Sequence, residues 1–238
     1  MRILITSGGT KVPIDPVRNI TNSSSGRFGA ELASAALAAG MEVIYLVAAH
    51  GHSPFCQHID YYTNDNWESN FQKLKTLHEF GGKYSKYYRE YRYQNFTEYH
   101  DILKSLVEIE KPDITMLTAA VSDYLVSNYA DSKIRTSEKL SINLQPAPKI
   151  IHAVKDWHPD TFLVGFKLLV NVTEAELISA ARISLTQHQS DLVIANDLST
   201  LRRGQHEVIM VEKDCSSQKY THDIATKIIT RCLQRPLI

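Results

Sequence analysis

Short β-branched runs alternate along the chain with longer stretches of helical periodicity. The first unit starts with the apolar run 2–6, passes through a polar loop into the Ala-rich segment 27–39, and returns to a β-branched run at 42–47. Apolar residues recur at helical spacing in 27–39, and Gly40 stands where a helix end favours a left-handed residue. This pattern predicts a strand, a helix and a second strand, the repeating unit of an α/β fold.

The rest of the chain continues this alternation. Further helices are predicted over 67–79, 97–110, 149–157, 173–188 and 222–234, and further strands over 114–117, 140–144, 162–166, 191–195 and 207–212. The segment Thr173-Glu174-Ala175-Glu176 has the pattern of a capping box at a helix start. We find neither an internal repeat nor a linker. The sequence therefore predicts a single domain over 1–238 with a Rossmann-like, three-layer α/β fold and a mostly parallel central sheet.

Composition narrows the class of protein without naming an activity. The 238 residues are 43% hydrophobic and 22% charged, as in ordinary globular proteins, and are enough to bury a core without crosslinks. Because 26 Lys and Arg balance 26 Asp and Glu, a globally basic nucleic-acid binder is excluded. No apolar run approaches the roughly 20 residues of a membrane span, and the N-terminus lacks the pattern of a signal peptide. We expect a cytoplasmic protein that binds neither nucleic acid nor membrane.

The cysteines have no spacing that suggests a metal or a redox pair. Cys56, Cys215 and Cys232 are far apart and odd in number. They are predicted to be buried or inert thiols of a reducing compartment.

The segment 81–96 is unusually rich in tyrosine and basic residues. Its tyrosines at i, i+3, i+4 and i+7 are Tyr84, Tyr87, Tyr88 and Tyr91, and the basic residues between them are Lys83, Lys86, Arg89 and Arg92. The favoured interpretation is a helix whose tyrosines pack on a neighbour or on a second subunit. The alternative is a patch that binds single-stranded nucleic acid by stacking and phosphate contact.

Two polar segments that precede the first predicted helix or begin it have the composition of a phosphate cradle. They are Ser7-Gly8-Gly9-Thr10, directly after the first strand, and Asn22 to Gly29, at the head of the helix. Glycine allows backbone amides to approach a ligand, and free amides at a helix start favour an anion. The sequence therefore predicts a nucleotide site here, although it contains no Walker loop.

An NAD(P)-dependent reductase on a Rossmann unit is the alternative function. Such a unit usually carries an acidic residue after its second strand for the ribose hydroxyls, but here that strand continues into Val47-Ala48-Ala49-His50-Gly51. The spacing Gly26-x-x-Gly29 supplies only half of the dinucleotide fingerprint, with Ser24 in place of its first glycine. These departures count against a dinucleotide.

Arg18 and Asn22 are candidates for direct contact with a substrate. Arg18 could clamp a carboxylate or phosphate, or it could form a surface salt bridge with Asp15. Asn22 could cap the serine-rich turn, or its amide could hold an acyl oxygen during a reaction. Both pairs of alternatives stay open at the level of the sequence.

Several motifs together resemble one family. In chain order they are Ser7-Gly8-Gly9-Thr10, Asp15-Pro16-Val17-Arg18, Asn22-x-Ser24-Ser25-Gly26-x-x-Gly29, Ala119-Ala120-Val121-Ser122-Asp123-Tyr124, Lys133-Ile134-Arg135, Gly165-Phe166-Lys167 and Ala195-Asn196-Asp197. This set is similar to that of phosphopantothenate–cysteine ligases of coenzyme A biosynthesis, in their free-standing form. The resemblance implies that 4′-phosphopantothenate is activated by a nucleoside triphosphate, with magnesium, to an acyl-nucleotidyl intermediate. The amine of L-cysteine then attacks this intermediate. It also implies a homodimer.

The resemblance assigns roles to particular residues. Asn22 and Lys133 match the catalytic residues, the first handling the intermediate and the second supporting its formation. The substrate site matches Asn22, Ala119, Ala120 and Asp123, with Arg18 reaching in from the partner subunit. The nucleotide site matches Gly8, Ser24, Gly26, Gly29, Asp123, Lys133, Phe166 and Asn196. It names no metal ligand.

The chain departs from bacterial members of the family at the lysine motif and the next loop. It reads Lys133-Ile134-Arg135-Thr136 and Ala147-Pro148-Lys149, where those members usually have Lys-x-Lys-Lys and Asn-Pro-Asp. Lysines that many of them carry on the following helix are replaced near Ser184 and His188. Eukaryotic members tend to use ATP and bacterial ones CTP. The compact chain resembles the free-standing Gram-positive bacterial form, and this resemblance favours CTP. ATP is the alternative, because Ser7-Gly8-Gly9-Thr10-Lys11-Val12-Pro13 and Gly165-Phe166-Lys167-Leu168 resemble eukaryotic members.

Overall fold

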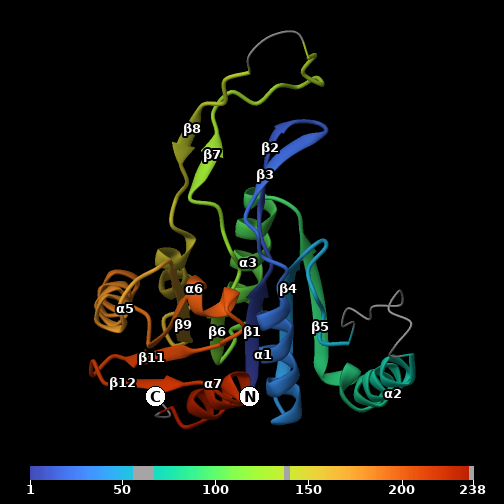
Figure 1. Cartoon of the computed structure of the whole chain (residues 1–238), viewed down its shortest axis with the longest axis vertical. Coiled ribbons are helices and arrows are strands. Elements are labelled where there is room, and N and C mark those ends of the chain that lie inside the picture. The colour runs from blue at the N-terminus through green and yellow to red at the C-terminus, as the bar shows by residue number, and fades with distance from the viewer. Residues whose placement is uncertain (56–66, 137–139, 236–238) are drawn as a thin grey trace.

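A large, mostly parallel sheet forms the centre of the protein. The computed structural model describes residues 1–55, 67–136 and 140–235, and in these the sheet has eight strands in the order β12-β11-β10-β9-β6-β1-β4-β5 (Figure 1). The strands are β1 Arg2–Ser7, β4 Glu42–Ala48, β5 Tyr88–Tyr93, β6 Ile114–Leu117, β9 Phe162–Leu169, β10 Leu192–Asp197, β11 Val208–Glu212 and β12 Ser217–Tyr220. From β5 to β10 all neighbours are parallel, whereas β11 and β12 run antiparallel. The predicted fold class is confirmed.

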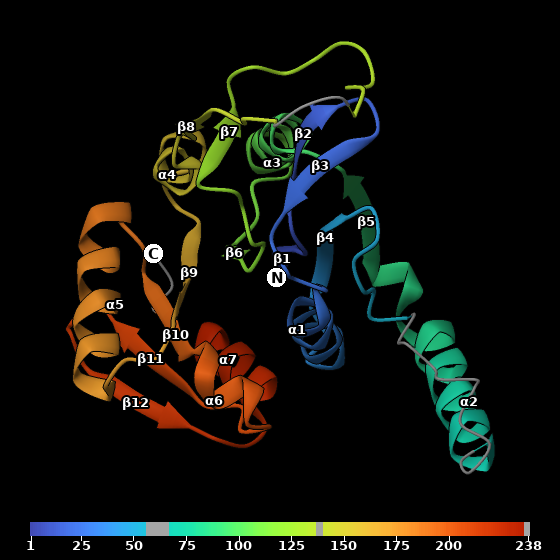
Figure 2. The ribbon, with the colours of Figure 1, turned by 45° about the horizontal axis from the view of Figure 1, so that its top comes forward.

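Helices cover both faces of this sheet. They are α1 Arg27–Ala38, α2 Trp67–Tyr84, α3 Phe96–Glu110, α4 Val154–Trp157, α5 Glu174–His188, α6 Leu198–Arg202 and α7 Ile224–Leu233, with 3-10 turns η2 Ser85–Tyr87 and η3 Ile150–Ala153. Alternate residues of β1 point to opposite faces: Ile3 and Ile5 pack with α1 and α7, and Leu4 packs with α3. Helix α5 covers the neighbouring strands β10 and β11. Figure 2 shows α1 and α7 side by side, and α2 projecting beyond the β5 edge.

Local sequence signals account for several helix boundaries. Thr173 caps α5 in the predicted capping box, since its side chain accepts from the Glu176 amide and the Glu176 side chain accepts from the Thr173 amide. Gly40, after α1, has a φ of 80°, as its predicted place after the helix requires.

Two β-hairpins form arms beyond the carboxyl ends of the central strands (Figure 1). The first joins β2 Lys11–Asp15 to β3 Arg18–Thr21, and the second joins β7 Tyr124–Val126 to β8 Leu144–Pro146. The sequence pattern predicted no strand in the first hairpin and misplaced one in the second. The strand predicted over 140–144 is displaced toward the carboxyl end, because pairing begins only at Leu144, and Leu140 and Leu144 are both exposed. A strand in a two-stranded arm has no core that would impose alternation.

The helix predicted through the tyrosine-rich segment is wrong. Tyr84 ends α2 and Tyr87 lies in η2, whereas Tyr88 and Tyr91 belong to β5. Parallel pairing with β4 over Tyr88–Tyr93 outweighs the helical spacing, which aromatic residues also tolerate in strands. The basic side chains are partly neutralised, since Arg89 pairs with Glu110 and Glu42 and Arg92 pairs with Glu90. This pairing reduces the positive charge available to the nucleic-acid interpretation.

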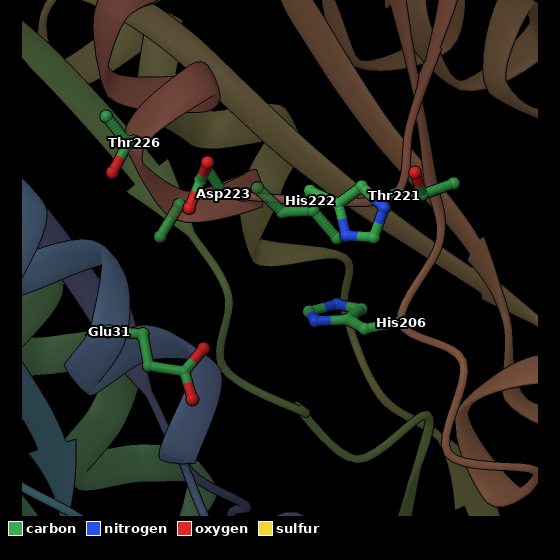
Figure 3. Close-up of a pocket in the computed structure, with 8 residues that line it drawn as sticks. Glu31, His206, Thr221, His222, Asp223 and Thr226 are labelled. Carbon is green, nitrogen blue, oxygen red and sulfur yellow. The ribbon is translucent and has the colours of Figure 1, made fainter.

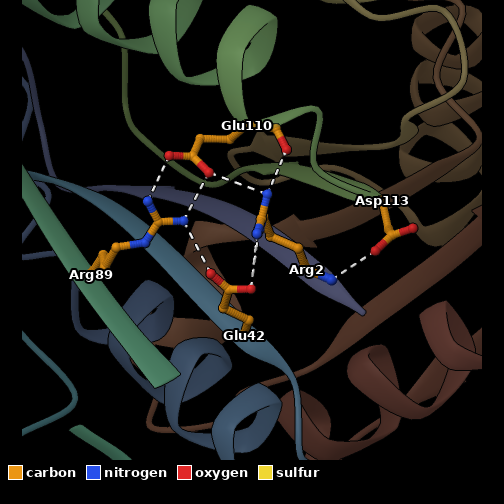
Figure 4. Close-up of polar contacts among 5 residues, drawn as sticks. All are labelled: Arg2, Glu42, Arg89, Glu110 and Asp113. Carbon is orange, nitrogen blue, oxygen red and sulfur yellow. Dashed lines mark hydrogen bonds and ion pairs between the residues drawn. The ribbon is translucent and has the colours of Figure 1, made fainter. Parts of the chain in front are cut away.

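An ion-pair network ties the amino-terminal end of the sheet together. Arg2 of β1 and Arg89 of β5 both contact Glu42 of β4 and Glu110 of α3, and the Arg2 amide donates to Asp113 at 2.7 Å (Figure 4). The hydrogen bond from Arg89 holds the pKa of Glu110 below its usual range. Four elements that are distant in sequence are thereby joined at the edge opposite the arms.

The cysteine prediction is only partly confirmed. Cys232 is fully buried in α7, and burial raises the pKa of its thiol to about 12. Cys215, in contrast, is exposed. It lies in the turn between β11 and β12, where its φ is 64°. Cys56 lies outside the described residues. Among the helices of the described part, none is long and apolar enough to cross a bilayer.

Candidate functional site

The loops after β1 and β6 meet at the carboxyl edge of the sheet. The Ala120 amide donates to the Gly8 carbonyl at 2.8 Å, and the Thr10 amide donates to the Ala120 carbonyl at 3.3 Å. The Thr10 hydroxyl also accepts from the Ser122 amide at 2.9 Å. Because β1 and β6 are parallel neighbours, their outgoing loops are necessarily adjacent, and ligands of open α/β sheets bind at this edge.

Asn22 lies over the junction of these loops. Its side-chain nitrogen donates to the Ala120 carbonyl at 2.9 Å, and its own carbonyl accepts from Ser24 at 2.8 Å. It does not cap the first helix, whose N-cap is Gly26. Its side chain is exposed, so one amide hydrogen is available to a ligand. The structure therefore brings together four predicted residues, Gly8, Asn22, Ala120 and, next to Ala120, Ala119.

The start of α1 is held directly against β1. Gly26 has a φ of 77° and makes no side-chain cap, while its carbonyl accepts from the Ser7 hydroxyl at 3.0 Å. A Cβ on Gly29 would lie 2.2 Å from Ser7 Oγ, 2.6 Å from Ser7 Cβ and 2.9 Å from Thr118 Oγ1. Both glycines are thus required by packing, in addition to the ligand role predicted for them.

This packing predicts the effect of one methyl group. We expect Gly29→Ala to lower the free energy of unfolding by about 3 kcal/mol. Rotating the Ser7 hydroxyl cannot relieve the clash, because the new methyl group also meets the Cβ of Ser7. The measurement is urea unfolding followed by circular dichroism. Gly82→Ala in α2 is the matched control, since nothing lies within 4 Å of a Cβ added there. This substitution should raise the free energy of unfolding by about 0.5–1 kcal/mol. Equal effects of the two substitutions would contradict this account.

Buried hydroxyl groups fix the β1 loop from behind. The Tyr93 hydroxyl donates to the Ser7 carbonyl at 2.8 Å, and the Tyr99 hydroxyl donates to Thr6 Oγ1 at 3.3 Å. The Thr118 hydroxyl donates to the Thr6 carbonyl. Burial raises the pKa of both tyrosines well above the usual range, so they stay protonated donors. Sequence reasoning missed these residues, and only their polarity within buried elements could have indicated them.

Arg18 joins the two arms within the same chain. Its Nη1 lies 2.6 Å from Asp15 Oδ2 and 3.1 Å from the Ile134 carbonyl. Burial alone would raise the pKa of Asp15, but bonds donated by Val17, Ile134 and Arg18 outweigh it and lower the pKa. The salt bridge considered from the sequence exists, although its carboxylate is buried. Arg18 keeps 39% of its side chain exposed, which leaves it accessible to a ligand.

Lys133 stands apart from the Asn22 cluster. It is exposed in the second arm, next to the Ile134 that contacts Arg18. Within the described residues, no hydrogen bond or ion pair joins it to Asn22. Asp123, at the base of the same arm, forms an ion pair with Lys149, and its carbonyl accepts from the Ala147 amide at 2.9 Å.

Phe166 and Asn196 lie on adjacent strands at the same edge. The rings of Phe166 and Phe28 of α1 pack edge to face, with their centroids 6.1 Å apart. The centroids of the Phe28 and His206 rings are 4.7 Å apart. Asn196 is half buried in β10, opposite Leu168 of β9. Phe28 and His206 thus form an aromatic wall with Phe166, the residue predicted for the nucleotide site, and the sequence did not indicate these two rings.

A cavity of about 450 Å³ lies beyond this wall, between α1 and the start of α7. It is lined by Glu31, His206, Thr221, His222, Asp223, Ile224, Ala225 and Thr226 (Figure 3). Burial raises the pKa of Glu31 and lowers that of His206. None of the predicted site residues lines this cavity, and we therefore place the candidate site at the sheet edge, where hydrogen bonds join Gly8, Asn22 and Ala120.

Comparisons with known proteins point to one family. The sequence matches the profile of the DNA/pantothenate metabolism flavoprotein C-terminal domain over residues 1–70 and 90–235. The coenzyme A biosynthesis bifunctional protein CoaBC of Thermococcus kodakarensis is 35% identical over 90% of this chain and 45% of its own. The human phosphopantothenate–cysteine ligase is 31% identical over 91% of this chain and 77% of its own.

A solved structure has the same fold. A variant of Cab2, the Saccharomyces cerevisiae phosphopantothenate–cysteine ligase, in complex with phosphopantothenate-cysteine superposes with a TM-score of 0.82. The two sequences are 28% identical, and the match covers 98% of this chain and 85% of the other. The chain spans about half the length of the bifunctional relatives it matches, 45% and 41% of two archaeal examples.

Proposed function

This chain belongs to the DNA/pantothenate metabolism flavoprotein C-terminal domain family, and on that premise we propose that it is a phosphopantothenate–cysteine ligase of coenzyme A biosynthesis. The observation that carries the proposal is the human ligase, whose similarity extends over 91% of this chain and 77% of its own. No contact in the described residues favours the alternative of an NAD(P)-dependent reductase, whose ribose-binding acid is missing after β4.

The proposed reaction has two steps. A carboxylate oxygen of 4′-phosphopantothenate attacks the α-phosphorus of a nucleoside triphosphate, and pyrophosphate leaves with the electrons of the broken P–O bond. The amino nitrogen of L-cysteine then attacks the acyl carbon, the nucleoside monophosphate leaves, and the nitrogen loses a proton. Activation divides one difficult condensation into two easier displacements.

The arrangement of side chains suits these two steps. Asn22, held over the β6 loop by Ala120, can donate its second amide hydrogen to the acyl oxygen. Lys133 can neutralise phosphate charge from the exposed arm, where nothing pairs with it in the described residues. The substrate lies against Ala119, Ala120 and Asp123. The nucleotide uses Gly8, Ser24, Gly26, Gly29, Asp123, Lys133, Phe166 and Asn196.

The nucleotide is proposed to be CTP, with ATP as the alternative, and magnesium is proposed to accompany it. Among the described residues, no three His, Cys, Asp or Glu side chains lie together as a metal site. This fits magnesium held by the triphosphate and water, since the ion commonly keeps several waters and binds through substrate phosphates. Magnesium would reduce the charge on the phosphates, while the chain itself supplies the amide donor of Asn22 and the ammonium donor of Lys133.

From family likeness we propose that the protein is cytoplasmic. Family likeness and the two arms also lead us to propose a homodimer. Exposed apolar side chains concentrate there: Val17, Ile20, Tyr124, Tyr129, Leu140 and Leu144. An apolar surface on two projecting hairpins suits a contact with a second copy. In such a dimer Arg18 is proposed to reach the partner's substrate site with its exposed guanidinium face.

The test is triphosphate-dependent pyrophosphate release. With 4′-phosphopantothenate, L-cysteine and magnesium, we expect one triphosphate, preferentially CTP, to yield equal amounts of pyrophosphate and 4′-phosphopantothenoylcysteine. Mass spectrometry identifies the product, and omission of phosphopantothenate is the control. Absence of pyrophosphate with every triphosphate would contradict the proposal, as would tight NADPH binding without triphosphate binding in a calorimetric titration.

A further inference from the structure

The two arms meet at a buried carboxylate. The hairpins β2–β3 and β7–β8 both project beyond the sheet, and β2 is in contact with β7 (Figure 1). Asp15 is the last residue of β2, and none of its side chain is exposed. A buried carboxylate is costly unless hydrogen bonds compensate for the lost water, so its partners indicate what it holds in place.

The two oxygens of this carboxylate bind different arms. Oδ1 accepts from the Val17 amide at 2.9 Å and from the Arg18 amide at 2.7 Å, which closes the turn of the first arm. Oδ2 accepts from the Ile134 amide of the second arm at 3.1 Å and from Arg18 Nη1 at 2.6 Å. The same Nη1 donates to the Ile134 carbonyl at 3.1 Å. Asp15 therefore holds both backbone groups of Ile134, one directly and one through Arg18.

Ile134 directly follows Lys133, the residue proposed to neutralise phosphate charge. Within the described residues 129–136, three hydrogen bonds connect the segment to the rest of the described chain. They are the two of Ile134 and the bond from the Ala130 amide to the Ile14 carbonyl at 3.1 Å. All three end on the first arm. The place from which the exposed Lys133 side chain extends is therefore set by the first arm.

We propose that Asp15 is a positioning residue for the first chemical step, which acts through Lys133 and touches neither substrate. The inference rests on the proposed function, which supplies the phosphate charge that Lys133 neutralises. A misplacement of about 1 Å can cost roughly a hundredfold in rate, so a lysine on a projecting arm needs a fixed backbone. The buried carboxylate fixes that backbone to the hairpin whose second strand leads directly to Asn22.

Asp15→Asn removes the bond to the second arm with little change to the first. The carbonyl oxygen of asparagine can still accept from the Val17 and Arg18 amides, as it does in such turns. Its NH2 group then faces two donors, the Ile134 amide and the Arg18 guanidinium, and cannot accept from either. The turn of the first arm is kept, while the segment that contains Lys133 is released.

Hydrogen–deuterium exchange measures this release without any substrate. In Asp15→Asn the amides of 129–136 should exchange at least about tenfold faster than in the wild type, whereas those of β3 should keep their rates. Asp131→Asn changes an exposed carboxylate of the same arm, and this matched control should exchange as the wild type. If circular dichroism shows that Asp15→Asn does not fold, Asp15→Ser takes its place, because its hydroxyl can accept from the turn amides but supplies no second oxygen for Ile134.

A double-mutant cycle distinguishes positioning from a purely structural effect. In single-turnover assays without cysteine, Asp15→Asn should slow pyrophosphate release by about tenfold or more. In the Lys133→Gln background the same substitution should change the rate by less than about twofold, because the group through which Asp15 acts is already missing. Asp131→Asn should stay within about twofold in both backgrounds.

The two measurements fail separately. Unchanged exchange of 129–136 in Asp15→Asn would overturn the inference, as would equal slowing of the first step by Asp15→Asn with and without Lys133. If the wild type releases no pyrophosphate with any triphosphate, the proposed ligase function fails on that result alone, and faster exchange in Asp15→Asn still shows that Asp15 holds the second arm.

Discussion

Replacing Asn22 with alanine is expected to lower the rate of phosphopantothenoylcysteine formation by about 10²–10³-fold while the acyl-nucleotidyl species accumulates on the enzyme. The Asn22 amide is fixed by its bond to the Ala120 carbonyl, so its second hydrogen is already aimed when the acyl oxygen gains charge. Losing it slows the attack of cysteine more than the first step. Rapid-quench experiments that follow pyrophosphate and product separately measure this division.

Two further variants define what Asn22 contributes. Asn22→Asp keeps the shape but removes the donor, and it should resemble the alanine variant. Asn19→Ala, exposed on the same hairpin, is the matched control and should retain activity. Mixing Asn22→Ala with Arg18→Ala subunits should restore part of the activity if Arg18 serves the partner's site. Equal slowing of both chemical steps by Asn22→Ala would reject the assigned role.

Replacing Lys133 with glutamine is expected to abolish the burst of pyrophosphate that wild type gives without cysteine, slowing the first step about 100-fold or more. The exposed ammonium group makes no ion pair within the described residues, so its charge is available to the triphosphate. Glutamine leaves the fold of the arm unchanged but removes the positive charge of Lys133. Single-turnover assays with phosphopantothenate and the triphosphate provide the measurement.

The neighbouring arm residue supplies the control for Lys133. Arg135→Gln removes a positive charge two positions away, also exposed, and should reduce the burst far less. Lys133→Arg should recover part of the burst, because it restores charge with different geometry. A normal burst in Lys133→Gln, or equal losses in Lys133→Gln and Arg135→Gln, would contradict a specific role.

Elements with a buried face could be predicted from the sequence, and elements without one could not. The α5 capping box and Gly40 are local signals with a single meaning, so both boundaries were predicted. The tyrosines of 81–96 satisfy helical spacing and strand propensity equally, and only pairing with β4 decides between them. The hairpin arms carry exposed apolar residues such as Leu140 and Leu144. Because these residues pack on no core, their spacing along the chain does not indicate the strands.

The candidate site shows the same division. Glycines, Asn22 and Ala120 lie in motifs that the sequence displays, although their contact across 98 positions needs the fold. The hydrogen bonds of Tyr93 and Tyr99 to Ser7 and Thr6 could not be predicted, since they depend on packing around parallel strands.

The bond from Tyr93 to Ser7 limits where the length of this protein can vary. The family profile passes over residues 71–89, which hold most of α2 and all of η2, and resumes at residue 90 within β5. Loops can lengthen or shorten there, provided that β5 keeps its register on β4 and so delivers Tyr93 to the β1 loop. A shortened version of the protein should therefore be cut before Tyr88, with the strand that follows kept whole.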